Sequence, residues 1–233
     1  LFFAFIGFDI VATTAEETKN PQRDVPIGIL GSLAIVTVLY AAVSLVVTGL
    51  RSYKDIDPDS AAPLADAFQA SGVDWMPNLI SIGACIGLVV VAMILMLGQS
   101  RVGFAMARDG LLPRSLAKVH PTWGTPYRIT ILTGIAVAAM AGLVDLSTLA
   151  HLVNIGTLFA FMLVSIGVVV LRRSRPDLPR GFRTPAAPVV AAVSTLMCFY
   201  LMLNLTGDTW IRFGVWMVIG FVVYFAYGRS HSR

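Results

Sequence analysis

Long intervals without a charged side chain constrain the fold of this sequence more than any other feature. A transmembrane helix needs about 20 consecutive, mainly apolar residues. Four uncharged intervals of 24 to 26 residues meet this length on their own: 27–50, 75–100, 146–171 and 184–207. Two further intervals, 129–144 and 213–228, hold 16 residues each. They reach spanning length if the adjacent Tyr127 and Trp210 lie at the membrane interface. The alternative is two buried helices of a soluble protein.

The overall composition also indicates a membrane protein. Hydrophobic residues make up 57% of the 233-residue chain and charged residues 13%, whereas soluble domains carry about 25% charged residues. We therefore predict an all-α polytopic membrane protein. The chain starts with Leu1 in the middle of an apolar run and lacks the basic region and cleavage site of a signal peptide. From this we expect a chain truncated inside its first helix.

The lysines and arginines predict an orientation in the membrane. If the uncharged intervals cross the bilayer, 14 of the 17 basic residues fall in alternate loops and 3 fall on the other side. Cytoplasmic loops carry the excess of Lys and Arg. The pattern therefore predicts about seven crossings, with a cytoplasmic C-terminus in a multi-pass protein of the cell membrane. Because the basic residues follow topology, they give no reason to expect a nucleic-acid partner.

Proline and glycine predict several local boundaries. Pro21 should end the first helix, since the residue before a proline disfavours the α region, and Pro26 suits the first turn of the next helix. A short helix is predicted outside the membrane at 62–71, stopped by Gly72. The third span should continue on the cytoplasmic side through 101–108.

The first segment, LFFAFIGFD, contains the most informative polar residue. Asp9 precedes Glu16 by seven residues, which places it about 10 Å inside the membrane at 1.5 Å per helical residue. A carboxylate at such depth usually faces a cavity or a partner. Gly7 permits a break in the helix, and transporters place their sites at such breaks, where unwound backbone can hold a charged substrate. The alternative is that Asp9 only caps the break.

The phenylalanines around this glycine have two interpretations. Their positions allow them to gate or to line a pocket, although aromatic side chains in membrane helices more often pack or face lipid. The four residues are Phe2, Phe3, Phe5 and Phe8.

Three other polar or small-residue patterns occur in the spans. Tyr40 lies on one helix face with Thr37 and Ser44 and could hydrogen-bond a carboxylate such as Asp9, whereas Thr and Ser can bond to their own helix. Ser81 and Ala84 belong to a small-residue face that chiefly indicates close packing, with a site role as the minority interpretation. The remaining pair, His151 and Asn154, is expected to make structural hydrogen bonds.

Motifs of enzymes and metal sites are not found in the sequence. It contains no HExxH, no GxSxG, no P-loop and no pair of intramembrane carboxylates. Cys85 and Cys198 both fall in apolar spans, where packing is a better explanation than a disulfide. We therefore expect no enzyme activity, no cofactor and no bound metal.

Several motifs together resemble the amino acid–polyamine–organocation permeases, with the cationic amino acid transporter branch as the best match. The resemblance covers nearly the whole chain. The motifs are FAFIGFD at 3–9, AEETKNPQR at 15–23, PIGI at 26–29, MARDGLLP at 106–113 and NIGTL at 154–158. They are similar to the family's sixth helix and following loop, the loop after its eighth helix and its tenth helix.

The resemblance implies a LeuT-like fold of five plus five helices in inverted repeat, followed by two peripheral helices. Residues 1–171 would hold helices six to ten, with the first one broken near Gly7. Residues 172–188 would form a basic cytoplasmic linker, and residues 189–233 would form helices eleven and twelve with a short tail. The remaining helices, which supply the other half of the site, would belong to an N-terminal part of the same polypeptide.

The resemblance also implies roles for individual residues. Carried over position by position, the substrate-binding residues would be Phe3, Ala4, Phe5, Ile6 and Gly7. Asp9 and Tyr40 would belong to a polar network tied to proton coupling. The expected activity is proton-coupled uptake of an amino acid by alternating access in the lipid bilayer. An amino acid or polyamine exchanger, a non-transporting amino-acid sensor and an inactive fragment remain as alternatives.

Overall fold

The computed structural model describes residues 2–15, 18–55, 62–70, 72, 75–177 and 180–232. Over these residues it is helical and contains no strand. The longer helices are α3 (Pro21–Leu50), α4 (Pro63–Ala70), α5 (Met76–Arg108), α6 (Tyr127–Leu143), α7 (Leu146–Ser174), α8 (Ala187–Leu203) and α9 (Gly207–Val223). The shorter ones are α1 (Phe2–Phe5), α2 (Ile10–Thr13), 3-10 turns at Tyr53–Asp55 and Arg114–Ala117, a π-helical turn at Tyr224–Gly228 and α10 (Arg229–His231).

The helix lengths confirm an all-α polytopic membrane protein. In the described part of the chain, four helical runs are long and apolar enough to cross a bilayer, namely α3, α5, α7 and the continuous run from α9 through α10. The helices α6 and α8 are apolar but have 17 residues each, or about 25 Å. That length lies at the lower limit for a span.

The structure corrects two expected lengths near the C-terminus. The uncharged interval 184–207 contains only the 17 residues of α8, because Ala186 has a left-handed backbone (φ 45°) and the helix ends before Asn204. Conversely, the 16-residue interval 213–228 is part of the 25-residue helical run from Gly207 to His231. The length of the uncharged interval therefore overestimates the length of α8 and underestimates the length of the helical run that begins with α9.

The other local boundaries are mixed in outcome. The short helix predicted at 62–71 is confirmed as α4, followed by Gly72 with φ 80°. The continuation of α5 through 101–108 is also confirmed, since the helix ends at Arg108. In contrast, α3 already begins at Pro21, so Pro26 lies inside the helix and does not start it.

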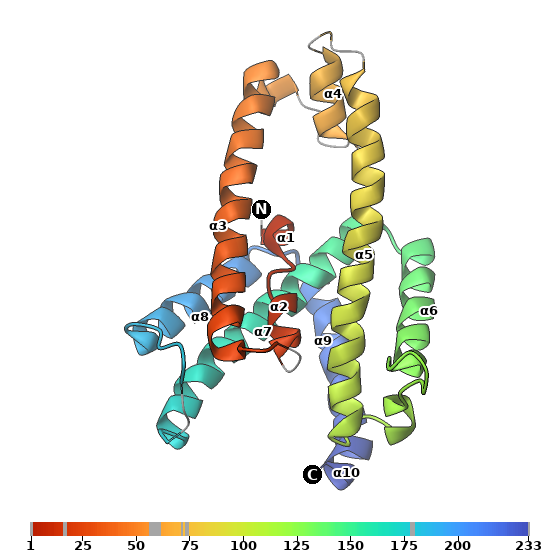
Figure 1. Ribbon diagram of the computed structural model, residues 1–233, viewed down its shortest axis with the longest axis vertical. Coiled ribbons are helices and arrows are strands. Elements are labelled where there is room, and N and C mark those ends of the chain that lie inside the picture. Colours follow the sequence, from red (N-terminus) through yellow and green to blue (C-terminus); the bar gives the residue numbers. More distant parts are fainter. Residues whose placement is uncertain are drawn as a thin grey trace.

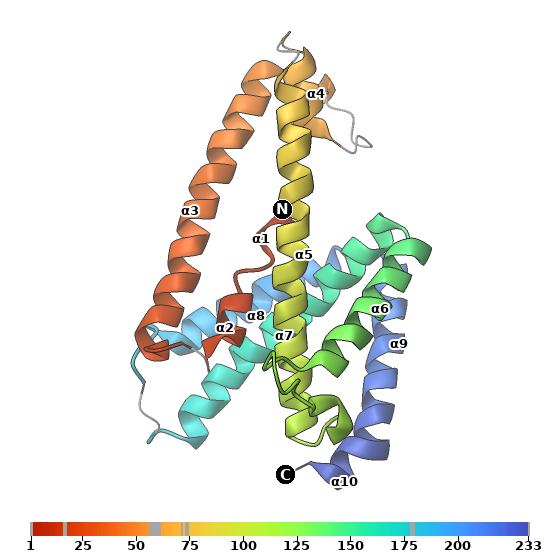
Figure 2. The same ribbon diagram turned by 45° about the vertical axis from the view of Figure 1, so that its right-hand side comes forward.

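Two long helices frame the N-terminal segment. In Figures 1 and 2, α3 and α5 extend as long rods, and α4 lies beside α5 near one end. The short helices α1 and α2 lie between α3 and α5, whereas α7 runs obliquely past them. The helices α8 and α9 pack against α7.

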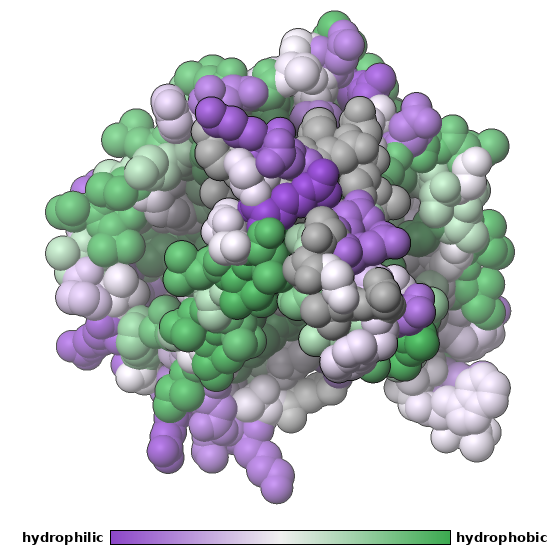
Figure 3. Space-filling view, turned by 90° about the horizontal axis from the view of Figure 1, so that it is seen from above, coloured by the Kyte–Doolittle hydropathy of each residue, from purple (hydrophilic) through white to green (hydrophobic). Residues whose placement is uncertain are grey.

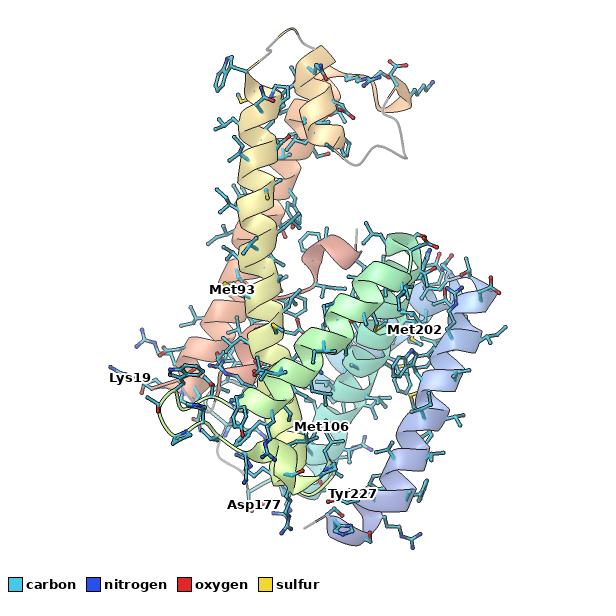
Figure 4. All side chains as sticks on the ribbon, turned by 90° about the vertical axis from the view of Figure 1, so that its right-hand side faces the viewer. Lys19, Met93, Met106, Asp177, Met202 and Tyr227 are labelled. Carbon is cyan, nitrogen blue, oxygen red and sulfur yellow. The ribbon has the colours of Figure 1, made fainter. Side chains whose placement is uncertain are left out.

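The best-buried cluster is formed where α7 and α8 meet. It consists of Ile155 and Leu158 of α7 with Cys198 and Met202 of α8, and Met202 is labelled in Figure 4. Most other apolar side chains are exposed, as expected of a surface that faces lipid. Seen from the α4 end, apolar side chains cover much of the flanks of the molecule (Figure 3).

Candidate functional site at the broken first helix

The predicted break lies at Gly7, between α1 and α2. Gly7 has φ 126°, a conformation that side-chain-bearing residues rarely adopt. Its N–H donates to Oδ1 of Asp9 at 3.2 Å, and its carbonyl accepts from the N–H of Ile10 at 3.2 Å. The Asp9 carboxylate therefore turns back onto the unwound residues and makes no cap bond to α2. This geometry agrees with the interpretation that Asp9 stabilises the break.

The helix α1 is held by polar and aromatic contacts. The hydroxyl of Tyr40 in α3 donates to the carbonyl of Ala4 at 2.8 Å. The Tyr40 ring also meets Phe5 edge to face, with ring centroids 5.2 Å apart. On the opposite side, Phe2 and Phe8 contact Phe161 of α7 at 6.1 and 5.4 Å between centroids. Three of the four predicted aromatic residues thus pack against neighbouring helices.

The helix α2 is held by close contact with two glycines. A Cβ placed on Gly28 of α3 would lie 3.3 Å from Cγ1 of Val11, and one placed on Gly98 of α5 would lie 3.3 Å from Cγ2 of Ile10. Small residues at such positions let helices approach closely within a membrane. Gly28 is seven residues from the start of α3, or about 10 Å along its axis.

A cleft of about 900 Å³ opens beside α2. The residues Ala12 and Thr13 of α2 form one wall, α5 forms a second, and α6 with its preceding loop closes the third side. Polar or aromatic side chains in the lining are Thr13, Ser100, Arg101, Phe104, Trp123, Thr125, Tyr127 and Thr130. Met93, which also lines the cleft, is labelled on α5 in Figure 4.

The loop before α6 is a folded wall of this cleft. Nδ1 of His120 accepts hydrogen bonds from the N–H groups of Thr122 and Trp123 at 3.3 and 3.4 Å. The His120 ring stacks on Trp123 with centroids 4.4 Å apart and meets Tyr127 edge to face. Sequence reasoning missed this loop, although the concentration of aromatic, proline and glycine residues in 120–127 was a usable signal.

The structure brings most of the predicted site residues together. The backbone of the segment from Ala4 to Asp9 lies between α3 and α5, and Tyr40 contacts it directly. The suggested pairing of Tyr40 with Asp9 is wrong, because the single hydroxyl proton of Tyr40 is used by the Ala4 carbonyl. The side chain of Phe3 lies outside the described residues. The side chains of Phe5 and Ile6 are half-buried.

The two other predicted pairs differ from expectation. Ser81 and Ala84 are exposed near the start of α5, and Ser81 bonds to the carbonyl of Pro77 in its own helix. They are at least 14 residues from Gly98, or about 21 Å along the helix axis. For His151 and Asn154 the expected hydrogen bonds are not observed. Within the described residues, Nδ1 of His151 and Oδ1 of Asn154 are buried without a partner.

Comparison with known proteins identifies the relatives of this chain. A profile of the family described as amino acid permease matches residues 1–225. Two relatives of Bacillus subtilis (strain 168), a methylthioribose transporter and the branched-chain amino acid permease BcaP, are each 48% identical over the whole chain, which covers 50% of each relative. The vacuolar cationic amino acid transporter 2 of Arabidopsis thaliana is 45% identical over 76% of the chain and 28% of its own length.

The matches cover only part of the length of each relative. The chain spans about half the length of the curated bacterial relatives that it matches. The relatives are named as transporters and permeases, not as enzymes, and the apolar helices make this an integral multi-pass membrane protein. The chain belongs to the amino acid permease family, within the amino acid–polyamine–organocation superfamily.

Proposed function

We propose that this chain forms the second half of a secondary active amino acid permease that works by alternating access. The observation that carries the proposal is the break at Gly7, held between α3 and α5 and followed by α2, whose Ala12 and Thr13 line a cleft of about 900 Å³. In transporters with broken helices, substrates bind where unwound backbone meets a cavity. The other half of the binding site would come from the N-terminal part of the same polypeptide.

The proposed substrate contacts are in the segment before Asp9. An amino acid carries an ammonium and a carboxylate, and both require polar partners inside a membrane. The unwound backbone around Gly7 supplies N–H and carbonyl groups at this depth, whereas Ala4, Phe5 and Ile6 supply apolar surface for the side chain of the substrate. Phe3 belongs to the same proposed set by its place in the sequence.

Proton coupling is proposed to act through Asp9. Its carboxylate accepts a hydrogen bond from the N–H of Gly7, and a bond to an ionised acceptor is roughly twice as strong as one between neutral groups. Protonation of Asp9 would therefore weaken the contact that fixes the unwound residues. Tyr40 contributes to the same network by holding the Ala4 carbonyl.

The names of the relatives support an amino acid as substrate and also supply a second candidate. Branched-chain and cationic amino acids are named for the permease and the plant transporters. However, methylthioribose is named for a relative of equal identity. We propose a multi-pass location in the cell membrane with a cytoplasmic C-terminus, and the division into residues 1–171, 172–188 and 189–233 stated above.

The test is uptake by the complete permease in proteoliposomes, with and without an inward proton gradient. Labelled leucine, arginine and methylthioribose would be compared. The key variant is Asp9→Asn, and the matched control is Asp24→Asn, which changes an exposed carboxylate in the first turn of α3. We expect gradient-driven uptake of an amino acid that Asp9→Asn abolishes and Asp24→Asn preserves.

Three results would contradict parts of this proposal. Uptake of methylthioribose alone would exclude the amino acid as substrate. Uptake that requires counter-substrate and ignores the proton gradient would show an exchanger, and full activity of Asp9→Asn would remove Asp9 from the coupling network. Binding of an amino acid without any flux would instead indicate a sensor.

A further inference from the structure

A second cavity lies away from the broken helix. It is a groove of about 490 Å³ between the end of α6, the start of α7 and the first turns of α9. These helix ends lie opposite the arginine-rich end of α7. The lining includes the polar residues Asp145, Thr148 and Arg212 and the apolar residues Leu143, Ile211 and Trp216.

The groove contains two opposite charges that do not neutralise each other. The guanidinium of Arg212 donates from Nη1 to Oγ1 of Thr148 at 3.2 Å, which links α9 to α7. Asp145 lies just before α7, and its carboxylate makes neither a hydrogen bond to the first turn of the helix nor an ion pair within the described part of the chain. A ligand that complements this groove would carry both an anionic and a cationic group.

The remaining walls are apolar and face outward. Leu143 is 86% exposed, Ile211 68% and Trp216 55%. In a membrane protein, apolar surface of this kind contacts acyl chains. The charges therefore lie beside lipid-facing surface, which favours a lipid over a small polar solute.

We propose that this groove binds the headgroup of an ethanolamine phospholipid. The phosphate would accept hydrogen bonds from Arg212, and the primary ammonium would donate to Asp145. One acyl chain would follow the apolar surface of α6 and α9. A choline headgroup carries the same charges but has no N–H to donate, and a glycerol headgroup has no positive charge. The site is therefore selective for ethanolamine.

The experiment measures lipid binding to the complete permease in detergent by native mass spectrometry. The ligands are ethanolamine, choline and glycerol phospholipids with identical acyl chains. A hydrogen bond between charged groups predicts a preference for ethanolamine over choline of roughly tenfold. Asp145→Asn should reduce this preference to near unity, and Arg212→Gln should weaken binding of both lipids.

The matched control is Asp208→Asn. Asp208 is an exposed carboxylate in the first turn of α9 and does not line the groove, so its replacement should preserve the preference. Equal binding of ethanolamine and choline lipids by the unchanged permease would overturn the proposal. So would a preference that survives Asp145→Asn, or competition by free phosphoethanolamine as effective as that by the lipid. If the rest of the polypeptide fills the groove, lipid binding would not change in any of these variants, and this result would also overturn the proposal.

Discussion

Replacement of Gly7 by alanine isolates the energetic cost of the break. At φ 126° a residue with a side chain is strained, and no atom lies within 4 Å of the position that a Cβ would occupy. The cost of Gly7→Ala therefore comes from the backbone alone, without a steric clash. Sparsely populated backbone conformations cost about 1–3 kcal/mol. We expect destabilisation of this size, because the surrounding helices hold the segment in place.

Gly31→Ala is the matched control. Gly31 lies inside α3, has no positive φ, and its Cβ would likewise meet no atom within 4 Å. In a helix interior, alanine is favoured over glycine by roughly 0.5–1 kcal/mol. The same chemical change should therefore stabilise the protein at position 31 and destabilise it at position 7. The expected difference between the two variants is about 1.5–4 kcal/mol.

The assay is thermal unfolding of the complete permease in detergent, together with uptake in proteoliposomes. Gly7→Ala should lower the midpoint temperature and the uptake rate, whereas Gly31→Ala should raise the midpoint slightly and leave uptake unchanged. Equal midpoints for the two variants would refute the argument, because they would show that the break tolerates a side chain at its centre. Lower stability with unchanged uptake would separate the strain at Gly7 from the transport cycle.

Two further substitutions test individual contacts in the bundle. Tyr40→Phe removes the hydrogen bond to the α1 carbonyl but keeps the ring contact with Phe5, so we expect a loss of about 0.5–1.5 kcal/mol in unfolding free energy; an unchanged midpoint temperature would contradict it. Ser165 of α7 and Ser194 of α8 have hydroxyls 3.0 Å apart, and a double-mutant cycle to alanine should give a coupling of roughly 0.6 kcal/mol, the average for such bonds in membranes. A coupling of zero would show that the two hydroxyls do not interact in the folded protein.

Features that depend on local sequence could be predicted. Hydrophobic length identified the spans of α3, α5 and α7, because backbone groups in a bilayer must be satisfied within one helix. A glycine two residues before an intramembrane carboxylate identified the break, since both residue types are costly in a continuous membrane helix. The short helix α4 followed from its polar flanks and Gly72.

Features that depend on contacts between distant residues could not be predicted. The sequence offered the Asp9 carboxylate as one partner for Tyr40, but a phenol donor bonds to any good acceptor within reach, and the Ala4 carbonyl is at 2.8 Å. The cleft beside α2 depends on a loop more than 100 residues later in the chain. The shortness of α8 depends on the left-handed Ala186, a conformation that the alanine itself does not favour.

The two halves of the broken helix are attached to the bundle by different kinds of force. Withdrawal of α1 from α3 would break the directional bond between Tyr40 and Ala4. By contrast, α2 rests on the smooth backbone surfaces of Gly28 and Gly98, and the hydroxyls of Thr13 and Thr14 bond to carbonyls of their own segment. A small sliding movement of α2 therefore exchanges one set of van der Waals contacts for another. The helix α1 is therefore fixed to α3 by a hydrogen bond, whereas α2, which lines the cleft, is held by van der Waals contacts and can slide.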